Sequence, residues 1–362
     1  MSLLEVSDLH VSFRTSDGDV QAVRGVSFEL EAGRTLGIVG ESGSGKSVCT
    51  QTLLGLTTGA RVRGIARFEG EDLLAMGEPE FRRIRGAKIA AIFQDPLSSL
   101  HPLYKVGWQI VEMIRAHEAV SKAVARRRAI DLLGQVGIPH PAQRVDDYPH
   151  QFSGGMRQRA LIAMALALEP QLVIADEPTT ALDATVQAQI LDLLLRLQQE
   201  NGMALIMITH DLGVIAGLAD DVLVMYAGRA AERADRRGLY YRAHHPYTNG
   251  LLESIPSSSA AGTRLRPIAG QPPSLIRLPS GCAFHPRCEF AMDRCRTEQP
   301  DLAPVDDGGR HTSACWLPGH LVGTTEEMKQ ARQDASAAGR AVERVPGQGS
   351  ATKDAAVEEG AA

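Results

Sequence analysis

The eight residues 40–47 constrain the fold of this chain more than any other part of its sequence. They read Gly-Glu-Ser-Gly-Ser-Gly-Lys-Ser and fit the pattern G-x-x-x-x-G-K-[ST] at every fixed position. The apolar run 35–39 before them predicts a strand, and the segment 46–56 after them predicts a helix. A glycine-rich loop between a strand and a helix is typical of phosphate binding, so the sequence predicts a nucleotide-binding α/β core.

The residue types of this loop suit a nucleoside triphosphate with Mg²⁺. Glycines let backbone N–H groups approach the phosphates closely, and the helix N-terminus adds a favourable dipole. Lys46 is expected to reach the β and γ phosphates, and the Ser47 hydroxyl to bind Mg²⁺. The alternative is a glycine-rich turn before an ordinary helix, which the full match disfavours. The predicted phosphate-binding residues are Gly40, Ser42, Gly43, Ser44, Gly45, Lys46 and Ser47.

A second candidate site is the apolar strand 172–175, which ends in the carboxylates Asp176 and Glu177. Successive residues at a strand end point in different directions, so the two carboxylates are expected to have different roles. Asp176 is predicted to face Mg²⁺, and Glu177 to act as the general base on the attacking water. The alternative is a solvated acidic strand end followed by a turn at Pro178, which the presence of the phosphate loop disfavours.

The remaining pattern predicts an α/β fold with appended lobes. Apolar alternation in 3–13 and 20–30 predicts an N-terminal antiparallel β lobe, and strands 172–175 and 205–208 around the helix 186–199 predict βαβ units. An inserted α-helical lobe is expected at about 95–155. The predicted units are a nucleotide-binding domain at 1–237, a small irregular module with four cysteines at 238–322, and a disordered tail at 323–362.

Composition and apolar patterning argue against a nucleic-acid-binding, secreted or membrane-spanning protein. The chain has 43 acidic and 38 basic residues, and its basic run 126–128 has no interleaved aromatic residue, so we expect no nucleic-acid partner. The N-terminus lacks the pattern of a signal peptide, and no apolar run approaches the ~20 residues that cross a bilayer. The chain is therefore expected in the cytosol, where its five cysteines are not expected to form a disulfide set.

Further segments resemble the motifs of ABC transporter ATPases. Residues 152–159, Phe-Ser-Gly-Gly-Met-Arg-Gln-Arg, resemble the ABC signature, although Met156 stands where many members have Gln. The other matches are Gln94 in the Q-loop, Ala181-Leu182-Asp183 in the D-loop, His210 as the switch histidine and Phe13 as the aromatic residue on adenine. Phe13 could equally be a core residue of a β-strand, and an isolated histidine is more often structural.

This resemblance implies an ATPase that works as a dimer. Glu177, His210 and Gln94 would be catalytic, and Ser47, Gln94 and Asp176 would hold Mg²⁺. The signature residues Ser153, Gly154 and Gly155, with Asp183, would act on ATP held by another subunit. A rival is a soluble ABC ATPase of DNA repair or translation, but this chain has one phosphate loop, one signature and no long heptad run. The presence of Glu177 and His210 disfavours a second rival, a regulatory subunit with little turnover.

The C-terminal third narrows the resemblance to importers of the oligopeptide/dipeptide type, which include nickel and glutathione systems. The matching residues are 245–248, Leu251 and Leu252, 281–288, Cys295 and 314–316. The resemblance implies a second, homologous ATPase subunit in a heterodimer, two transmembrane permease subunits and an extracytoplasmic substrate-binding protein. The chain would then lie at the cytoplasmic face of the inner membrane and energise peptide import, with nickel or glutathione as alternative solutes.

Four of the five cysteines fall in the C-terminal third: Cys282, Cys288, Cys295 and Cys315. Five, six and nineteen residues separate them, whereas structural zinc usually takes cysteine pairs at C-x₂₋₄-C spacing. Iron–sulfur clusters accept wider separations, and the family resemblance also favours a [4Fe–4S] cluster. Zinc remains an alternative with His285 or His311, as does a set of reduced cysteines that act as small apolar residues.

Overall fold

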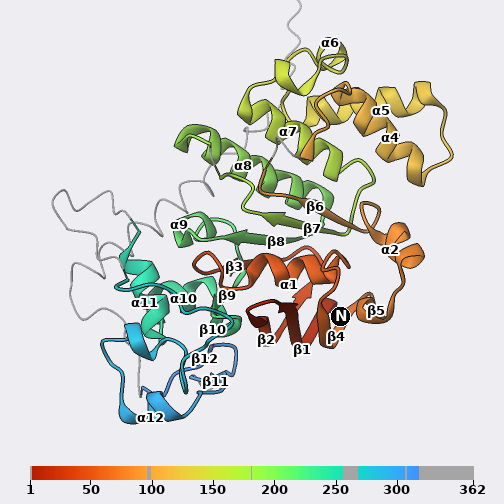
Figure 1. Ribbon diagram of the computed structural model, residues 1–362. Helices are drawn as coiled ribbons and strands as arrows, with labels where there is room; N and C mark the ends of the chain where they lie inside the picture. The colour runs from red at the N-terminus through yellow and green to blue at the C-terminus, as the bar shows by residue number, and fades with distance from the viewer. Residues whose placement is uncertain (1, 96–98, 181, 256–267, 306–307, 318–362) are drawn as a thin grey trace, which may run out of the picture.

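A computed structural model describes residues 2–95, 99–180, 182–255, 268–305 and 308–317 (Figure 1). Its strands form two sheets. One has four strands in the order β2-β1-β4-β5, and the other has eight in the order β11-β12-β10-β9-β3-β8-β7-β6. The α/β class and the N-terminal antiparallel lobe predicted from the sequence are confirmed.

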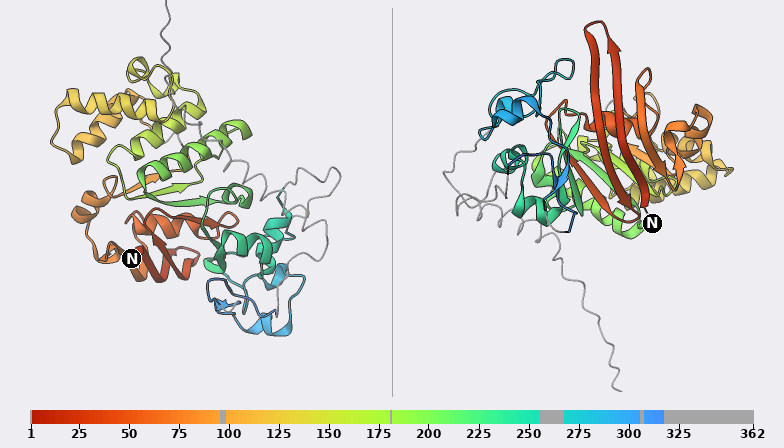
Figure 2. Two further views of the ribbon diagram at one scale, coloured as in Figure 1. Left: turned by 180° about the vertical axis from the view of Figure 1, so that it is seen from behind. Right: turned by 90° about the horizontal axis from the view of Figure 1, so that it is seen from below.

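The N-terminal sheet is built on a long hairpin. Strands β1 (Ser2–Thr15) and β2 (Gly18–Glu31) pair antiparallel across a two-residue turn, and the pairing contains several register shifts. β4 (Arg61–Phe68) pairs with β1, and β5 (Glu71–Asp72) pairs with β4. Seen from below, the hairpin projects as a long ribbon along one side of the molecule (Figure 2).

The large sheet has a parallel centre that is buried on both faces. β3 (Thr35–Val39) lies between β8 (Ala204–Thr209) and β9 (Asp221–Tyr226), and β7 (Leu172–Asp176) and β6 (Ile89–Ile92) follow β8. α8 (Ala184–Asn201) contributes to the apolar core on one face, and α1 (Lys46–Leu53) to the core on the other. The predicted strands are thus confirmed, but α1 ends before 56 because Gly55 turns the chain with a φ of 63°.

Helices fill the segment between β6 and β7. They are α4 (Val106–His117), α5 (Lys122–Gln135), α6 (Pro141–Arg144), the 3-10 turn η2 (Pro149–Gln151) and α7 (Gly154–Ala165). They form the lobe at the top of Figure 1, while η1 (Leu73–Ala75) and α2 (Glu78–Ile84) lie before β6. Among the residues with described positions, no helix is both long and apolar enough to cross a membrane.

The C-terminal third joins the large sheet rather than standing apart from it. β10 (Arg229–Asp235) runs antiparallel to β9, and β12 (Thr312–Ser313) pairs with β10 and with β11 (Ala303–Pro304). The helices of this region are α9 (Leu212–Ile215), α10 (Arg236–Arg242), α11 (Pro246–Glu253), η3 (His285–Arg287) and α12 (Asp293–Thr297). The predicted boundary after residue 237 stays a prediction, and the predicted tail 323–362 lies outside the described residues.

Candidate functional site

The phosphate loop lies between β3 and α1, and its backbone needs glycine at two positions. Gly40 and Gly45 have φ values of 156° and 99°. A Cβ atom on Gly40 would lie 2.2 Å from the carbonyl oxygen of Met225, and one on Gly45 would lie 2.2 Å from that of Ala22. A side chain at either position would therefore force the loop away from the neighbouring strands.

Lys46 begins α1 and is nearly buried, with 5% of its surface exposed. Its ammonium group donates to the carbonyl oxygens of Gly40 at 2.6 Å and Glu41 at 2.9 Å. Burial lowers the pKa of Lys46, while the nearby carboxylates of Glu177, Asp176 and Glu41 raise it. The ammonium group has neutral hydrogen-bond partners, so its charge is available to an anionic ligand.

Two of the three groups predicted to bind Mg²⁺, Ser47 and Asp176, lie side by side, while Gln94 contacts Glu177. The Ser47 hydroxyl donates to the Asp176 carboxylate at 3.0 Å, because the ends of β3 and β7 reach the same edge of the sheet. Burial raises the pKa of Asp176, and the Ser47 hydrogen bond opposes that shift. No group of three or more His, Cys, Asp or Glu in the described ranges is arranged to hold a metal ion. This pair still fits Mg²⁺, which usually takes only one or two carboxylates together with phosphate oxygens and water.

Glu177 is the centre of a small cluster of polar side chains. Its carboxylate accepts hydrogen bonds from Gln94 Nε2 at 3.1 Å and Thr180 Oγ1 at 2.9 Å, and lies 3.2 Å from His210 Nδ1. The Glu177 backbone has a φ of 46° and donates to the Ile208 carbonyl oxygen. The three residues predicted to be catalytic are thus brought together. Thr180 was not predicted, because a threonine three residues after a carboxylate has no distinctive signal.

A cavity of about 860 Å³ joins the phosphate loop to this cluster. Its lining includes Gln94, Glu177, His210 and the loop residues 41–48. The C-terminal third supplies four more lining residues, none of which was predicted to bind nucleotide: Leu251, Ser254, Ile268 and Pro272. The cavity is large enough for a nucleotide and has a charged, polar end at the phosphate loop.

The signature and D-loop residues form a separate surface. Ser153 caps α7 by accepting from the Met156 N–H at 3.3 Å, and Asp183 caps α8 in the same way with Val186 at 3.0 Å. A Cβ atom on Gly155 would lie 2.8 Å from Val186, so the two helix starts pack closely. None of Ser153, Gly154, Gly155 and Asp183 lines the phosphate-loop cavity in the described part of the chain. Ala181 of the D-loop lies outside the described residues.

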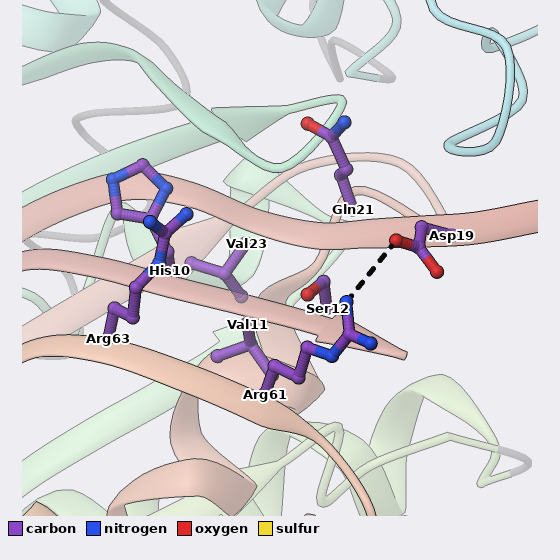
Figure 3. Close-up of a pocket in the computed structure, with 8 residues that line it drawn as sticks. All are labelled: His10, Val11, Ser12, Asp19, Gln21, Val23, Arg61 and Arg63. Carbon is purple, nitrogen blue, oxygen red and sulfur yellow. Dashed lines mark ion pairs between the residues drawn. The ribbon is translucent and has the colours of Figure 1, made fainter. Parts of the chain in front are cut away.

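A second hollow, of about 510 Å³, lies on the N-terminal sheet (Figure 3). It is lined by His10, Val11, Ser12, Asp19, Gln21, Val23, Arg61 and Arg63. Figure 3 shows the single ion pair among these residues, between Arg61 and Asp19 at 3.6 Å. Phe13, the predicted adenine partner, is outside both linings and packs, partly buried, against the core. Its stacking on adenine stays a prediction.

The four C-terminal cysteines line one small cavity: Cys282, Cys288, Cys295 and Cys315. Burial raises the pKa of Cys282, and raises those of Cys288 and Cys315 to about 11. His285 also lines this cavity, whereas His311 pairs with the buried carboxylate of Glu232 at 2.6 Å. The four cysteines thus share one cavity, but no group of three or more His, Cys, Asp or Glu in the described part of the chain is arranged to hold a metal ion. The [4Fe–4S] cluster stays a prediction, as does zinc.

Known proteins match both parts of the chain. Residues 23–180 match the ABC transporter family, and residues 231–295 match the oligopeptide/dipeptide transporter C-terminal region. The oligopeptide transport ATP-binding protein OppD of Salmonella typhimurium is 52% identical over 317 residues, which are 87% of this chain and 94% of that protein. The dipeptide transport ATP-binding protein DppD of Bacillus subtilis is 50% identical over 318 residues, with coverages of 87% and 94%.

Solved structures resemble the fold over a shorter range. A dimeric ATP-binding cassette in a post-hydrolysis state, bound to ADP and Pi, has a TM-score of 0.59 and 26% identity. The match covers 65% of this chain and 99% of that structure. A second dimeric structure of the same protein, described as a bacterial ABC transporter cassette, has a TM-score of 0.58, with the same identity and coverages.

Proposed function

Since this chain belongs to the ABC transporter family, as the ATP-hydrolysing subunit of a peptide importer, we propose that it drives import by closing on a second ATPase subunit around ATP. The observation that carries this proposal is the cavity in which Lys46 faces the Glu177 cluster. The signature residues needed to complete such a site lie elsewhere on the same chain.

Within the cavity, different groups of this chain bind the triphosphate and activate the attacking water. The phosphate loop binds the triphosphate through backbone N–H groups and Lys46. Glu177 accepts the proton of the attacking water, while His210 and Gln94 hold its carboxylate in place. Ser47, Asp176 and Gln94 would hold Mg²⁺, which neutralises charge on the phosphates.

The second ATPase subunit is proposed to be a homologue of this chain in a heterodimer. Ser153 starts α7 with its hydroxyl and the adjacent glycine N–H groups at a helix N-terminus, where an anion is favoured. Because this surface lies apart from the cavity, it is suited to the γ-phosphate of ATP bound by the other subunit. The dimeric state of the solved cassette, in both of its structures, supports the pairing of two ATPase subunits.

The partners in the membrane are proposed to be two permease subunits, which an extracytoplasmic binding protein supplies with substrate. Leu103, Tyr104 and Trp108 are exposed on the helical lobe, Leu103 by 77%, and the rings of Tyr104 and Trp108 stack 4.2 Å apart. An exposed apolar group of this kind supports docking of a partner protein. The chain would then act at the cytoplasmic face of the membrane. The similar transport proteins are named for oligopeptides and dipeptides, and we propose a peptide of one of these two classes as the solute.

The composite site predicts that hydrolysis depends on assembly. The isolated chain at low concentration should hydrolyse ATP at least roughly tenfold more slowly than the complex with its partner ATPase and permease, because Ser153 must reach another subunit's nucleotide. Steady-state ATP turnover over a series of protein concentrations measures this effect. A monomer as active as the complex, with turnover independent of concentration, would overturn the composite-site mechanism.

The cysteine cavity is proposed to hold a [4Fe–4S] cluster with a structural role. Protein purified without oxygen should be brown and contain about four iron atoms per chain, since each of the four thiolates would bind one iron. Cys288→Ser should lower the iron content, whereas Cys49→Ser should not, because Cys49 is a buried residue of α1 and does not line the cysteine cavity. Colourless protein with stoichiometric zinc, or without metal, would contradict the cluster.

A further inference from the structure

Glu41, at a variable position of the phosphate loop, is held by three separate contacts. Its carbonyl oxygen accepts from the Lys46 ammonium at 2.9 Å, and its backbone N–H donates to the Tyr247 hydroxyl at 2.8 Å. Its carboxylate accepts two hydrogen bonds from the Arg287 guanidinium, at 2.6 and 2.9 Å. Two of these three contacts come from the C-terminal third, so that region helps to determine the shape of the phosphate loop.

Arg287 is placed to act as a rigid clamp on Glu41. Only 5% of its side chain is exposed, and it also donates to the Tyr226 hydroxyl at 3.2 Å and to the Ala269 carbonyl oxygen at 2.9 Å. A planar guanidinium with two parallel bonds to one carboxylate fixes both distance and orientation, which a lysine cannot do. The pair is also costly to break, because removing Arg287 would leave the Glu41 carboxylate unpaired beside the site of a triphosphate.

The clamp is close in the chain to residues that line the cysteine cavity, although Arg287 itself does not line it. Arg287 lies in η3, between Cys282 and Cys288, and the cavity is lined by Phe284 and by both of these cysteines. The Phe284 ring lies 5.4 Å from that of Tyr247, the residue that binds the Glu41 N–H. His245, two residues before Tyr247, lines the same cavity. The region around the cysteines is therefore linked to Glu41 in two ways, through the Arg287 side chain and through the Tyr247 hydroxyl.

We infer that the 282–288 loop regulates nucleotide binding, with Arg287 as a positioning residue that presets the phosphate loop through Glu41. When the loop is ordered around its cysteines, Arg287 and Tyr247 hold Glu41 in the conformation that binds ATP. When the loop loosens, the Glu41 carboxylate is released next to the phosphates and weakens their binding. The inference rests on the proposed function because it assumes that the phosphate loop, residues 40–47, binds ATP.

Affinity for MgATP in the full-length chain tests the clamp. Arg287→Gln should weaken binding roughly tenfold, because it breaks a charge-assisted pair and leaves the Glu41 carboxylate unpaired. Arg287→Lys should also weaken binding, by a smaller factor, since it keeps the charge but loses the two parallel bonds. Arg296→Gln is the matched control, an exposed arginine of the same region, and should bind as the wild type does.

Amide hydrogen exchange of residues 41–44, measured relative to exchange in β7 and β8, separates positioning of the phosphate loop by Arg287 from a general loss of stability. Exchange there should speed up in Arg287→Gln and in Cys288→Ser, and the double variant should exchange no faster than either single variant. Unchanged affinity in Arg287→Gln and Arg287→Lys, or additive exchange effects, would overturn the inference while leaving ATP binding intact. A wild-type chain that does not bind MgATP would instead overturn the proposed function.

Discussion

Glu177→Gln is expected to bind MgATP with the affinity of the wild-type chain and to lose hydrolysis by roughly 10²–10⁴-fold, the range that a general base contributes. The amide has nearly the same size and can still hydrogen-bond to His210 and Thr180, but it cannot accept the proton of the attacking water. Calorimetric titration with MgATP and steady-state turnover in the assembled complex separate the two effects. ATP should therefore stay trapped in the closed dimer.

Glu169→Gln is the matched control for this variant. Glu169 also has a left-handed backbone, with a φ of 51° against 46° for Glu177, but it is exposed and lies outside the cavity lining within the described residues. The same substitution there should leave turnover unchanged. Near-normal turnover in Glu177→Gln would remove this carboxylate from the role of base. A decrease confined to nucleotide affinity would assign it to binding instead.

Lys46→Ala, in contrast to Glu177→Gln, is expected to act mainly on nucleotide affinity. It should weaken MgATP binding by roughly a hundredfold, about 2.7 kcal/mol. The substitution removes the one buried ammonium group described in the phosphate loop, and with it the hydrogen bonds to Gly40 and Glu41 that brace the loop. Turnover at saturating ATP should fall less than the affinity does if Glu177 and its partners stay in place. The same calorimetric titration measures the loss.

Lys88→Ala provides the control for the loss of a positive charge. Lys88 pairs with Glu69 at 2.6 Å, and both side chains are partly exposed, so this surface pair is expected to contribute little. ATP affinity in that variant should match the wild type. Wild-type affinity in Lys46→Ala, in protein with an unchanged melting temperature, would contradict the assigned role of the loop lysine.

The phosphate loop is the part of this protein that its sequence determined most fully. Gly40 and Gly45 adopt conformations that only glycine accepts easily, and the apolar run before them forms β3 as predicted. These interactions join residues that are close in the chain, so residue type and spacing are enough to specify them. The roles of Asp176, Glu177 and His210 could also be predicted, because each lies at or just after the carboxyl end of a buried strand.

Only the tertiary structure decided which of these groups meet. Glu177 contacts Gln94 and His210 because β6, β7 and β8 are neighbours in one sheet. The pairing of Arg287 with Glu41 joins residues 246 positions apart, and no periodicity in either segment indicates it. A contact of that kind depends on how the C-terminal third packs against the large sheet. Such packing is the sum of many small apolar contacts, which leave no local signal in the amino-acid sequence.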